Sequence, residues 1–159
     1  MIKRKIFEDY IEGNIDKAFR FAYSYSGNKS DAEDVVSESV VKALSKISSL
    51  RDTEKINCWF MSIIANTAKQ NLRRQKKFVF ESEDSAEKIA AKEESSFFEF
   101  EDLIKNLDVK YRELLIMKYF EGFTFKEISE ISSLSENTVK TRLYRAIELL
   151  KPKLEGELK

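Results

Sequence analysis

The chain of 159 residues contains no histidine, one cysteine, one proline and four glycines. Histidine is the commonest metal ligand and general base in proteins, so its absence removes the usual means of building a catalytic or metal centre. A lone cysteine, Cys58, forms neither an internal disulfide nor a cysteine-based zinc cluster. No pairing of a nucleophile with a base stands out in the remaining sequence. We therefore expect no metal, no cofactor, no small-molecule substrate and no enzymatic activity.

Long hydrophobic runs are also absent. No apolar stretch approaches the length of a membrane-spanning helix. The first residues, MIKRKIFEDYIEG, are charged where a signal peptide has an apolar core. We expect a cytoplasmic protein with no direct insertion into a membrane.

The scarcity of glycine and proline leaves little to interrupt helices. Hydrophobic residues make up 42% of the chain and recur at helical spacing, which predicts an all-α fold with real hydrophobic cores. The one proline, Pro152, is expected to terminate or kink the last helix.

Charge is present in quantity but is separated along the chain. Lysine and arginine together number 28, as do aspartate and glutamate. Residues 66–77 hold five basic and no acidic residues, and residues 136–153 hold five basic and two acidic ones. Residues 81–102 hold nine acidic and two basic residues. The net charge of zero therefore includes two basic segments and an acidic segment between them.

Helical periodicity and capping residues divide the chain into two small helical domains, residues 1–77 and 101–159, joined by an acidic linker, residues 78–100. In the first domain we expect Asn14 to cap one helix that ends at Gly27. A capping box from Ser30 to Glu33 is expected to open the next helix. A polar loop over residues 47–57 should precede a long helix from about Lys55 to Lys77.

In the second domain, Asp108 is the expected N-cap of an apolar helix over residues 111–120, and Gly122 ends it. Thr124 and Glu127 form a second capping box, which opens a short helix. A break at 132–133 and a cap at Ser135 then introduce the last helix. Phe97, Phe98 and Phe100, at the end of the linker, are expected to begin docking on this domain.

The last helix carries the strongest functional signal. At 3.6 residues per turn, one face collects the apolar side chains Val139, Leu143, Ala146, Ile147 and Leu150. The opposite face and its flanks collect hydrogen-bonding and cationic groups, namely Asn137, Thr138, Lys140, Thr141, Arg142, Tyr144 and Arg145. A short helix, a tight break and a second helix of this kind predict a DNA-binding helix-turn-helix.

These residues carry a family resemblance. The segment LDVKYRELLIMKYFEGFTFKEISEISSLSENTVKTRLYRAIELLKPKL (107–154) resembles region four of bacterial RNA polymerase sigma factors. DAEDVVSESVVKAL (31–44) and CWFMSIIANTAKQNLRRQKK (58–77) together resemble region two. The order of the segments and the short spacer are similar to the extracytoplasmic-function (ECF) subgroup of the sigma-70 family. The resemblance covers about four-fifths of the chain.

The resemblance implies a sigma factor that binds core RNA polymerase and promoter DNA, with an anti-sigma factor as a further partner. It implies polymerase contacts on the helix that carries Asp31, Glu33, Asp34 and Glu38. Asp31 and Glu33 also suit the start of a helix for electrostatic reasons alone, and both roles stay open.

Region two is implied to melt the promoter and recognise the minus-ten element. The implied residues lie in the loop of about 48–55 and on the long helix: Ser48, Ser49, Arg51, Trp59, Asn66, Lys69, Gln70, Arg73 and Arg74. An aromatic ring, amides and cations are what a single DNA strand needs for stacking, base contacts and phosphate neutralisation. Burial in the core is the competing interpretation for Trp59.

Region four is implied to read the minus-thirty-five element through Glu136, Asn137, Thr138, Lys140, Thr141, Arg142 and Arg145. Of these, Lys140, Thr141 and Arg145 are the favoured contacts. The chain departs from the family pattern at Ser133, where a glycine is usual. A serine in a left-handed conformation costs on the order of 1 kcal/mol, so we expect this turn to adopt another geometry.

Two other functions compete with this interpretation. An operator-binding regulator would carry a ligand pocket in residues 1–77, which no motif signals. A sigma mimic that sequesters an anti-sigma factor would have lost the cations of its DNA faces, but Lys69, Arg73, Arg74, Lys140, Arg142 and Arg145 are all present.

Overall fold

A computed structural model describes residues 2–76 and 92–157, which form two compact units on either side of residues 77–91. Every regular element in these described ranges is helical, and no strand occurs among them. The all-α prediction is confirmed. Each unit has its own buried core.

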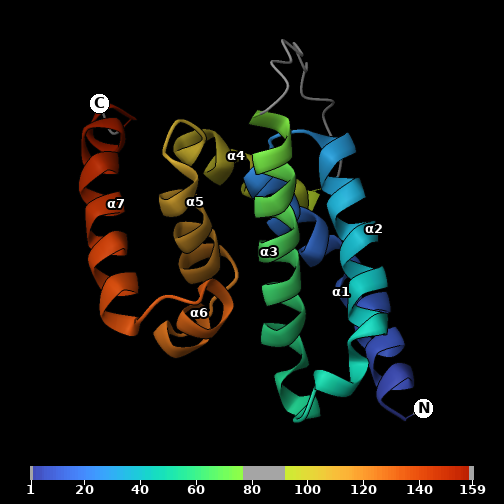
Figure 1. Ribbon diagram of the computed structural model, residues 1–159. Helices are drawn as coiled ribbons and strands as arrows, with labels where there is room; N and C mark the ends of the chain where they lie inside the picture. The colour runs from blue at the N-terminus through green and yellow to red at the C-terminus, as the bar shows by residue number, and fades with distance from the viewer. Residues whose placement is uncertain (1, 77–91, 158–159) are drawn as a thin grey trace. The chain divides into compact units, whose positions relative to one another are not determined.

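The first unit is a bundle of three long helices, α1 (Ile2–Ser26), α2 (Lys29–Ser45) and α3 (Ile56–Lys76), which pack against one another (Figure 1). Aromatic side chains fill much of the core. The ring of Phe7 meets that of Phe60 edge-on, with 5.2 Å between the ring centroids. Two short 3₁₀ turns, η1 (Ile47–Ser49) and η2 (Thr53–Lys55), connect α2 to α3 where the sequence predicted a plain loop.

The predicted start of the first helix at Asn14 is wrong. Helix α1 begins near the N-terminus and runs through Asn14, whose side-chain Nδ2 donates to the Tyr10 carbonyl. The reason is tertiary: the N-terminal half of α1 buries Phe7, and the Tyr10 hydroxyl donates to Asn57 Oδ1 at 2.6 Å. Packing of this half outweighs the local capping preference of asparagine. The predicted end is confirmed, since Gly27 follows α1 with φ +73°.

The predicted capping box at Ser30 is also wrong. Helix α2 starts at Lys29, and Asn28 is its N-cap: the Asn28 Oδ1 accepts from the backbone N–H of Asp31 at 2.8 Å. Asparagine and serine are similarly good N-caps, so the sequence alone did not distinguish Asn28 from Ser30, two residues later. The long basic helix α3 matches its prediction within one residue at each end.

The second unit contains α4 (Lys92–Ile104), α5 (Val109–Leu115), the π-helical segment η3 (Ile116–Phe120), α6 (Phe125–Ser132) and α7 (Glu136–Glu157). Helix α7 packs against both α5 and α6 (Figure 1). The caps at Asp108 and Ser135 and the capping box of Thr124 with Glu127 are confirmed. Pro152 lies inside α7, which continues to Glu157, so of the two expected effects of the proline, termination or a kink, termination does not occur.

Residues 92–100, predicted as the end of the acidic linker, form the first part of α4. Phe97 is 1% exposed, and its ring lies 5.1 Å from that of Phe120, so this segment packs in the second unit. At the other end of α4, Lys153 of α7 donates to the carbonyls of Asp102 and Leu103, both at 3.1 Å. A lysine there satisfies carbonyls that the helix end leaves without partners. The rest of the predicted linker, residues 78–91, lies outside the described residues.

Candidate nucleic-acid interfaces

Helix α7 has one buried apolar face and one exposed polar face, as its helical periodicity predicted. Val139, Leu143 and Ala146 are buried to 3% exposure or less. On the opposite side, five predicted contact residues are exposed, namely Glu136, Asn137, Lys140, Thr141 and Arg145, while Thr138 and Arg142 are half-buried. The core therefore holds the helix by one stripe and leaves a polar, cationic ridge in solvent.

The turn before α7 holds this ridge in place. Ser133 adopts a left-handed conformation (φ 62°, ψ 27°), so the expectation of another geometry is wrong. The hydroxyl of Ser129 donates to the Leu134 carbonyl and ties α6 to the turn. Ser135 Oγ accepts from the backbone N–H of Thr138 and donates to the Thr138 hydroxyl oxygen. Thr138 is thus part of the cap.

The Thr141 hydroxyl is held as a donor within the helix, so its oxygen can act as an acceptor toward other groups. Its hydroxyl donates to the carbonyl of Asn137, one turn earlier, at 2.9 Å. With its proton engaged, the Thr141 oxygen presents acceptor lone pairs to an incoming ligand. An exposed acceptor of this kind suits the amino group of adenine or cytosine in the major groove.

Two lysines share one aromatic ring beside the ridge. Lys118 Nζ lies 4.3 Å and Lys140 Nζ 5.3 Å from the ring centroid of Phe125, at the start of α6. Both distances are within the range of a cation–π interaction. Tyr144, which lies on the same exposed face of α7 and is 66% exposed, was on the predicted polar face but not among the predicted contacts.

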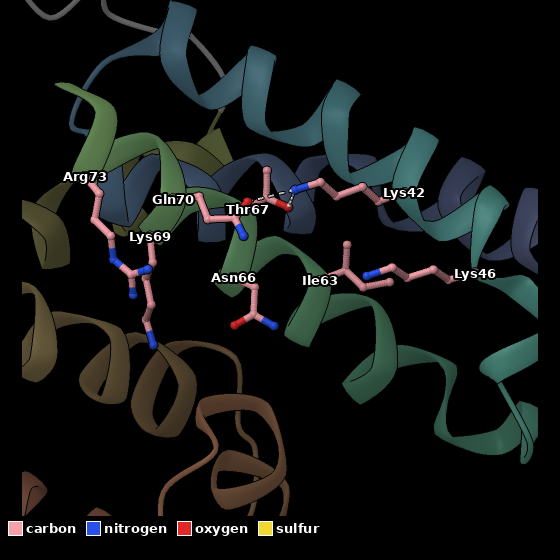
Figure 2. A pocket seen from close by; sticks show the side chains of 8 residues that line it. All are labelled: Lys42, Lys46, Ile63, Asn66, Thr67, Lys69, Gln70 and Arg73. Carbon is pink, nitrogen blue, oxygen red and sulfur yellow. Dashed lines mark hydrogen bonds between the residues drawn. The ribbon is translucent and has the colours of Figure 1, made fainter.

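A second cationic site lies in the first unit, between α2 and α3. Figure 2 shows a groove lined by Lys42, Lys46, Ile63, Asn66, Thr67, Lys69, Gln70 and Arg73. Four predicted residues of α3, Asn66, Lys69, Gln70 and Arg73, are therefore brought together. Lys42 and Lys46 of α2 and Thr67 of α3 were missed, because the prediction considered each helix by itself.

Lys42 links the two walls of this groove. Its ammonium group donates to Thr67 Oγ1 at 3.2 Å and to Gln70 Oε1 at 3.1 Å, as the dashed lines in Figure 2 show. It also pairs with Glu38 Oε1 at 3.4 Å. Arg74 reaches the same Glu38 oxygen at 3.9 Å. The polar surface of α3 is thus fixed by side chains from α2.

The connection between α2 and α3 presents its polar residues to solvent. Ser48, Ser49 and Arg51 are exposed, and Trp59 Nε1 donates to Ser49 Oγ at 3.1 Å. The Trp59 ring is half-buried and lies 6.0 Å from that of Phe7, edge-on. The indole therefore anchors this connection to the core while part of its surface stays accessible.

The four acidic residues predicted to contact polymerase fall into two pairs. Asp31 Oδ2 accepts from Asn28 Nδ2 and from Gln75 Nε2, both at 2.7 Å, and Glu38 pairs with Lys42 and Arg74. Glu33 and Asp34 are exposed on α2, and Glu33 Oε1 lies 3.9 Å from Nζ of the exposed Lys29. The first pair joins α2 to α3, and the second pair faces solvent.

Comparison with known proteins agrees with this arrangement. Residues 10–78 match the family described as Sigma-70 region 2, and residues 97–150 match Sigma-70, region 4. The chain is 37% identical over 141 residues to RNA polymerase sigma factor SigV of Bacillus subtilis, covering 87% of this chain and 85% of the relative. The chain belongs to the sigma-70 family of RNA polymerase sigma factors.

Further similarities place it in the ECF subgroup of that family. It is 26% identical to the ECF sigma factor SigW of Bacillus subtilis, over 97% of each chain. The fold resembles that of the sigma factor RpoE from Bartonella quintana, solved with the anti-sigma factor NepR, with a TM-score of 0.76, 22% identity and coverage of 94% of this chain and 96% of that one. The groove between α2 and α3 therefore lies in sigma region 2, and the ridge of α7 lies in region 4. In the described parts of this sigma factor, no helix is both long and apolar enough to cross a membrane.

Proposed function

We propose that this sigma factor binds core RNA polymerase and directs initiation at promoters with two elements, each contacted by one unit. The observation that carries the proposal is the exposure of Lys140, Thr141 and Arg145 on a helix whose opposite stripe is buried. Cations beside short polar side chains on such a helix suit phosphates and base edges in a major groove. We assign minus-thirty-five recognition to this ridge, within residues 101–159.

Promoter melting and minus-ten recognition are assigned to residues 1–77. The groove between α2 and α3 combines lysines and an arginine with the amides of Asn66 and Gln70. Such a groove is suited to an unpaired strand, because cations neutralise its phosphates and amides meet base edges that are no longer paired. The segment that joins the two units is shorter than the predicted linker, because α4 of the second unit begins at Lys92.

Polymerase contact is assigned to the outer face of α2. Glu33 and Asp34 are the best candidates, because their carboxylates face solvent and suit a basic partner surface. Asp31 and Glu38 contribute by holding α2 against α3. The proposal places the protein in the cytoplasm with the polymerase, includes an anti-sigma factor as a regulatory partner, and assigns the chain no catalytic step of its own.

The test is transcription in vitro with purified core polymerase and fragmented genomic DNA from the source organism. The 5′ ends of the transcripts are sequenced with and without the sigma factor. We expect new start sites that share two upstream sequence elements at a fixed separation. Start sites identical to those of core polymerase alone would overturn the proposal.

A matched pair of variants separates polymerase binding from DNA binding. Replacing Glu33 and Asp34 together with alanine should reduce co-purification with core polymerase. Replacing Lys140 and Arg145 together with alanine should leave co-purification unchanged and abolish promoter-specific starts. Loss of polymerase binding in the second variant alone would contradict the assignment of surfaces.

A further inference from the structure

The Gln70 side chain in the region 2 groove has a fixed orientation. A lysine ammonium group donates hydrogen bonds and accepts none. Since Lys42 Nζ lies 3.1 Å from the end of the Gln70 side chain, the atom facing it must be the carbonyl oxygen. The amide NH₂ group is then directed away from Lys42, and Figure 2 shows it pointing to the side of the groove where Asn66 lies.

The ammonium group of Lys42 is engaged with groups of the protein itself. It donates to the hydroxyl of Thr67 and to the amide oxygen of Gln70, and it forms an ion pair with Glu38 Oε1 at 3.4 Å. The positive charge of Lys42 is therefore directed at these partners. Lys46, one turn further along the chain, lines the same groove and is exposed, so its charge is available to solvent and to an anion.

From this contrast we propose that Lys42 is a positioning residue for base recognition in region 2. It holds the Gln70 amide so that its NH₂ group donates to an acceptor atom on one unpaired promoter base. Lys46 has the other role, a sequence-independent contact with the phosphate backbone. The inference rests on the proposed function, because it names how the region 2 groove tells one base from another.

The experiment measures base preference by holoenzyme reconstituted from core polymerase and full-length sigma factor. The templates form a library built on a promoter found with the wild-type protein. In this library each position of the minus-ten element, which lies downstream of the minus-thirty-five element, is A, C, G or T in turn. Transcripts are counted by sequencing for the wild type, Lys42→Met, Lys42→Arg, Lys46→Met and Gln70→Glu. Circular dichroism confirms that each variant is folded.

For Lys42→Met we expect the wild-type preference at a single position to fall about five- to tenfold, the effect of losing one oriented hydrogen bond. Lys42→Arg, which can still donate to Gln70, should retain much of the wild-type preference at that position. Lys46→Met should lower transcription on every template alike and reduce the salt dependence of promoter binding. Gln70→Glu, which removes the donor, should reproduce the loss at the position affected by Lys42→Met.

The outcomes separate the two claims. If the wild-type holoenzyme starts nowhere that core alone does not, the proposed function fails. If the wild type is active and Lys42→Met either keeps the full preference or loses activity equally at all positions, the positioning role is overturned. A preference lost at one position by Lys42→Met and at a different one by Gln70→Glu also overturns it.

Discussion

In the region 2 unit, the polar side chains of the groove come from two helices and bond to each other across the gap, whereas the ridge of region 4 belongs to one helix. Gln70 of α3 is oriented by Lys42 of α2, 28 residues earlier in the chain. Thr141 of α7 is oriented by the carbonyl of Asn137 on its own helix. Recognition by region 2 should therefore depend on tertiary packing, and recognition by region 4 on local helix structure.

The largest predicted effect tests whether the two units are separate folding bodies. Phe97→Ala removes a fully buried ring of α4 that contacts Phe120 and should destabilise the second unit by about 3–5 kcal/mol. The first unit should be unaffected. Trp59, the one tryptophan in the chain, reports on the first unit by fluorescence, while circular dichroism follows both units during urea unfolding.

The expected result is an unchanged fluorescence transition beside an earlier loss of part of the helical signal. Phe98→Ala, at a half-buried neighbour, is the matched control and should have a smaller effect. A shift of the Trp59 transition by the same amount would mean that the units unfold together, and the comparison between them would fail.

The next effect concerns the acceptor on α7. Thr141→Val keeps the shape of the side chain and removes the hydroxyl, so one position of the upstream element should lose about 1–3 kcal/mol of discrimination. Thr141→Ser, which keeps the hydroxyl, should retain the preference. Promoter binding by holoenzyme on templates with single base changes measures both. An equal weakening on all templates would show that Thr141 contacts only the backbone.

A smaller effect is expected at the turn of the helix-turn-helix. Ser133→Gly removes the steric strain of a side chain in the left-handed conformation. Glycine also has more conformational freedom in the unfolded chain, which offsets part of this gain, so the second unit should become more stable by about 0.5–1 kcal/mol. Ser133→Ala keeps the strain and should give no gain. Urea unfolding followed by circular dichroism measures the difference. A glycine variant no more stable than the wild type would show that the surrounding contacts already offset the strain.

The smallest predicted effect concerns the Phe125 ring, which positions two lysines without carrying a charge itself. Phe125→Leu removes the ring shared by Lys118 and Lys140, and affinity for the upstream element should fall by about 0.5–1 kcal/mol on every sequence. Both charges remain, so the dependence of affinity on salt should change little. Phe125→Tyr should behave as the wild type. A change in salt dependence as large as that of Lys140→Ala would contradict a positioning role for the ring.

The comparison also explains what could be predicted from the sequence. The exposed ridge of α7 was predictable because a single helix buries Val139 and Leu143 at a spacing that leaves Lys140 and Arg145 outside. The cationic side of α3 was predictable for the same reason. The Lys42 contacts were not, since a pairing between helices depends on how α2 and α3 pack, and helical periodicity carries no information about that.

Local signals failed where tertiary contacts outweighed them. Asn14 has the side chain of a good N-cap, but burial of Phe7 extends α1 past it. Asn28 and Ser30 are both suitable caps two residues apart, and the structure selects Asn28. Serine was expected to avoid the left-handed turn, but Ser133 occupies it, supported by the nearby bond from Ser129 to the Leu134 carbonyl.

The most direct test of the account is to sequence the transcripts that core polymerase makes from a randomised promoter library with the wild-type sigma factor, Thr141→Val and Gln70→Ala. The account predicts two conserved elements at a fixed separation, with Thr141→Val changing the base preference of the upstream element only and Gln70→Ala that of the downstream element only. A single element, or an equal response of both elements to each variant, would contradict the claim that two separate units of one chain each recognise their own part of the promoter.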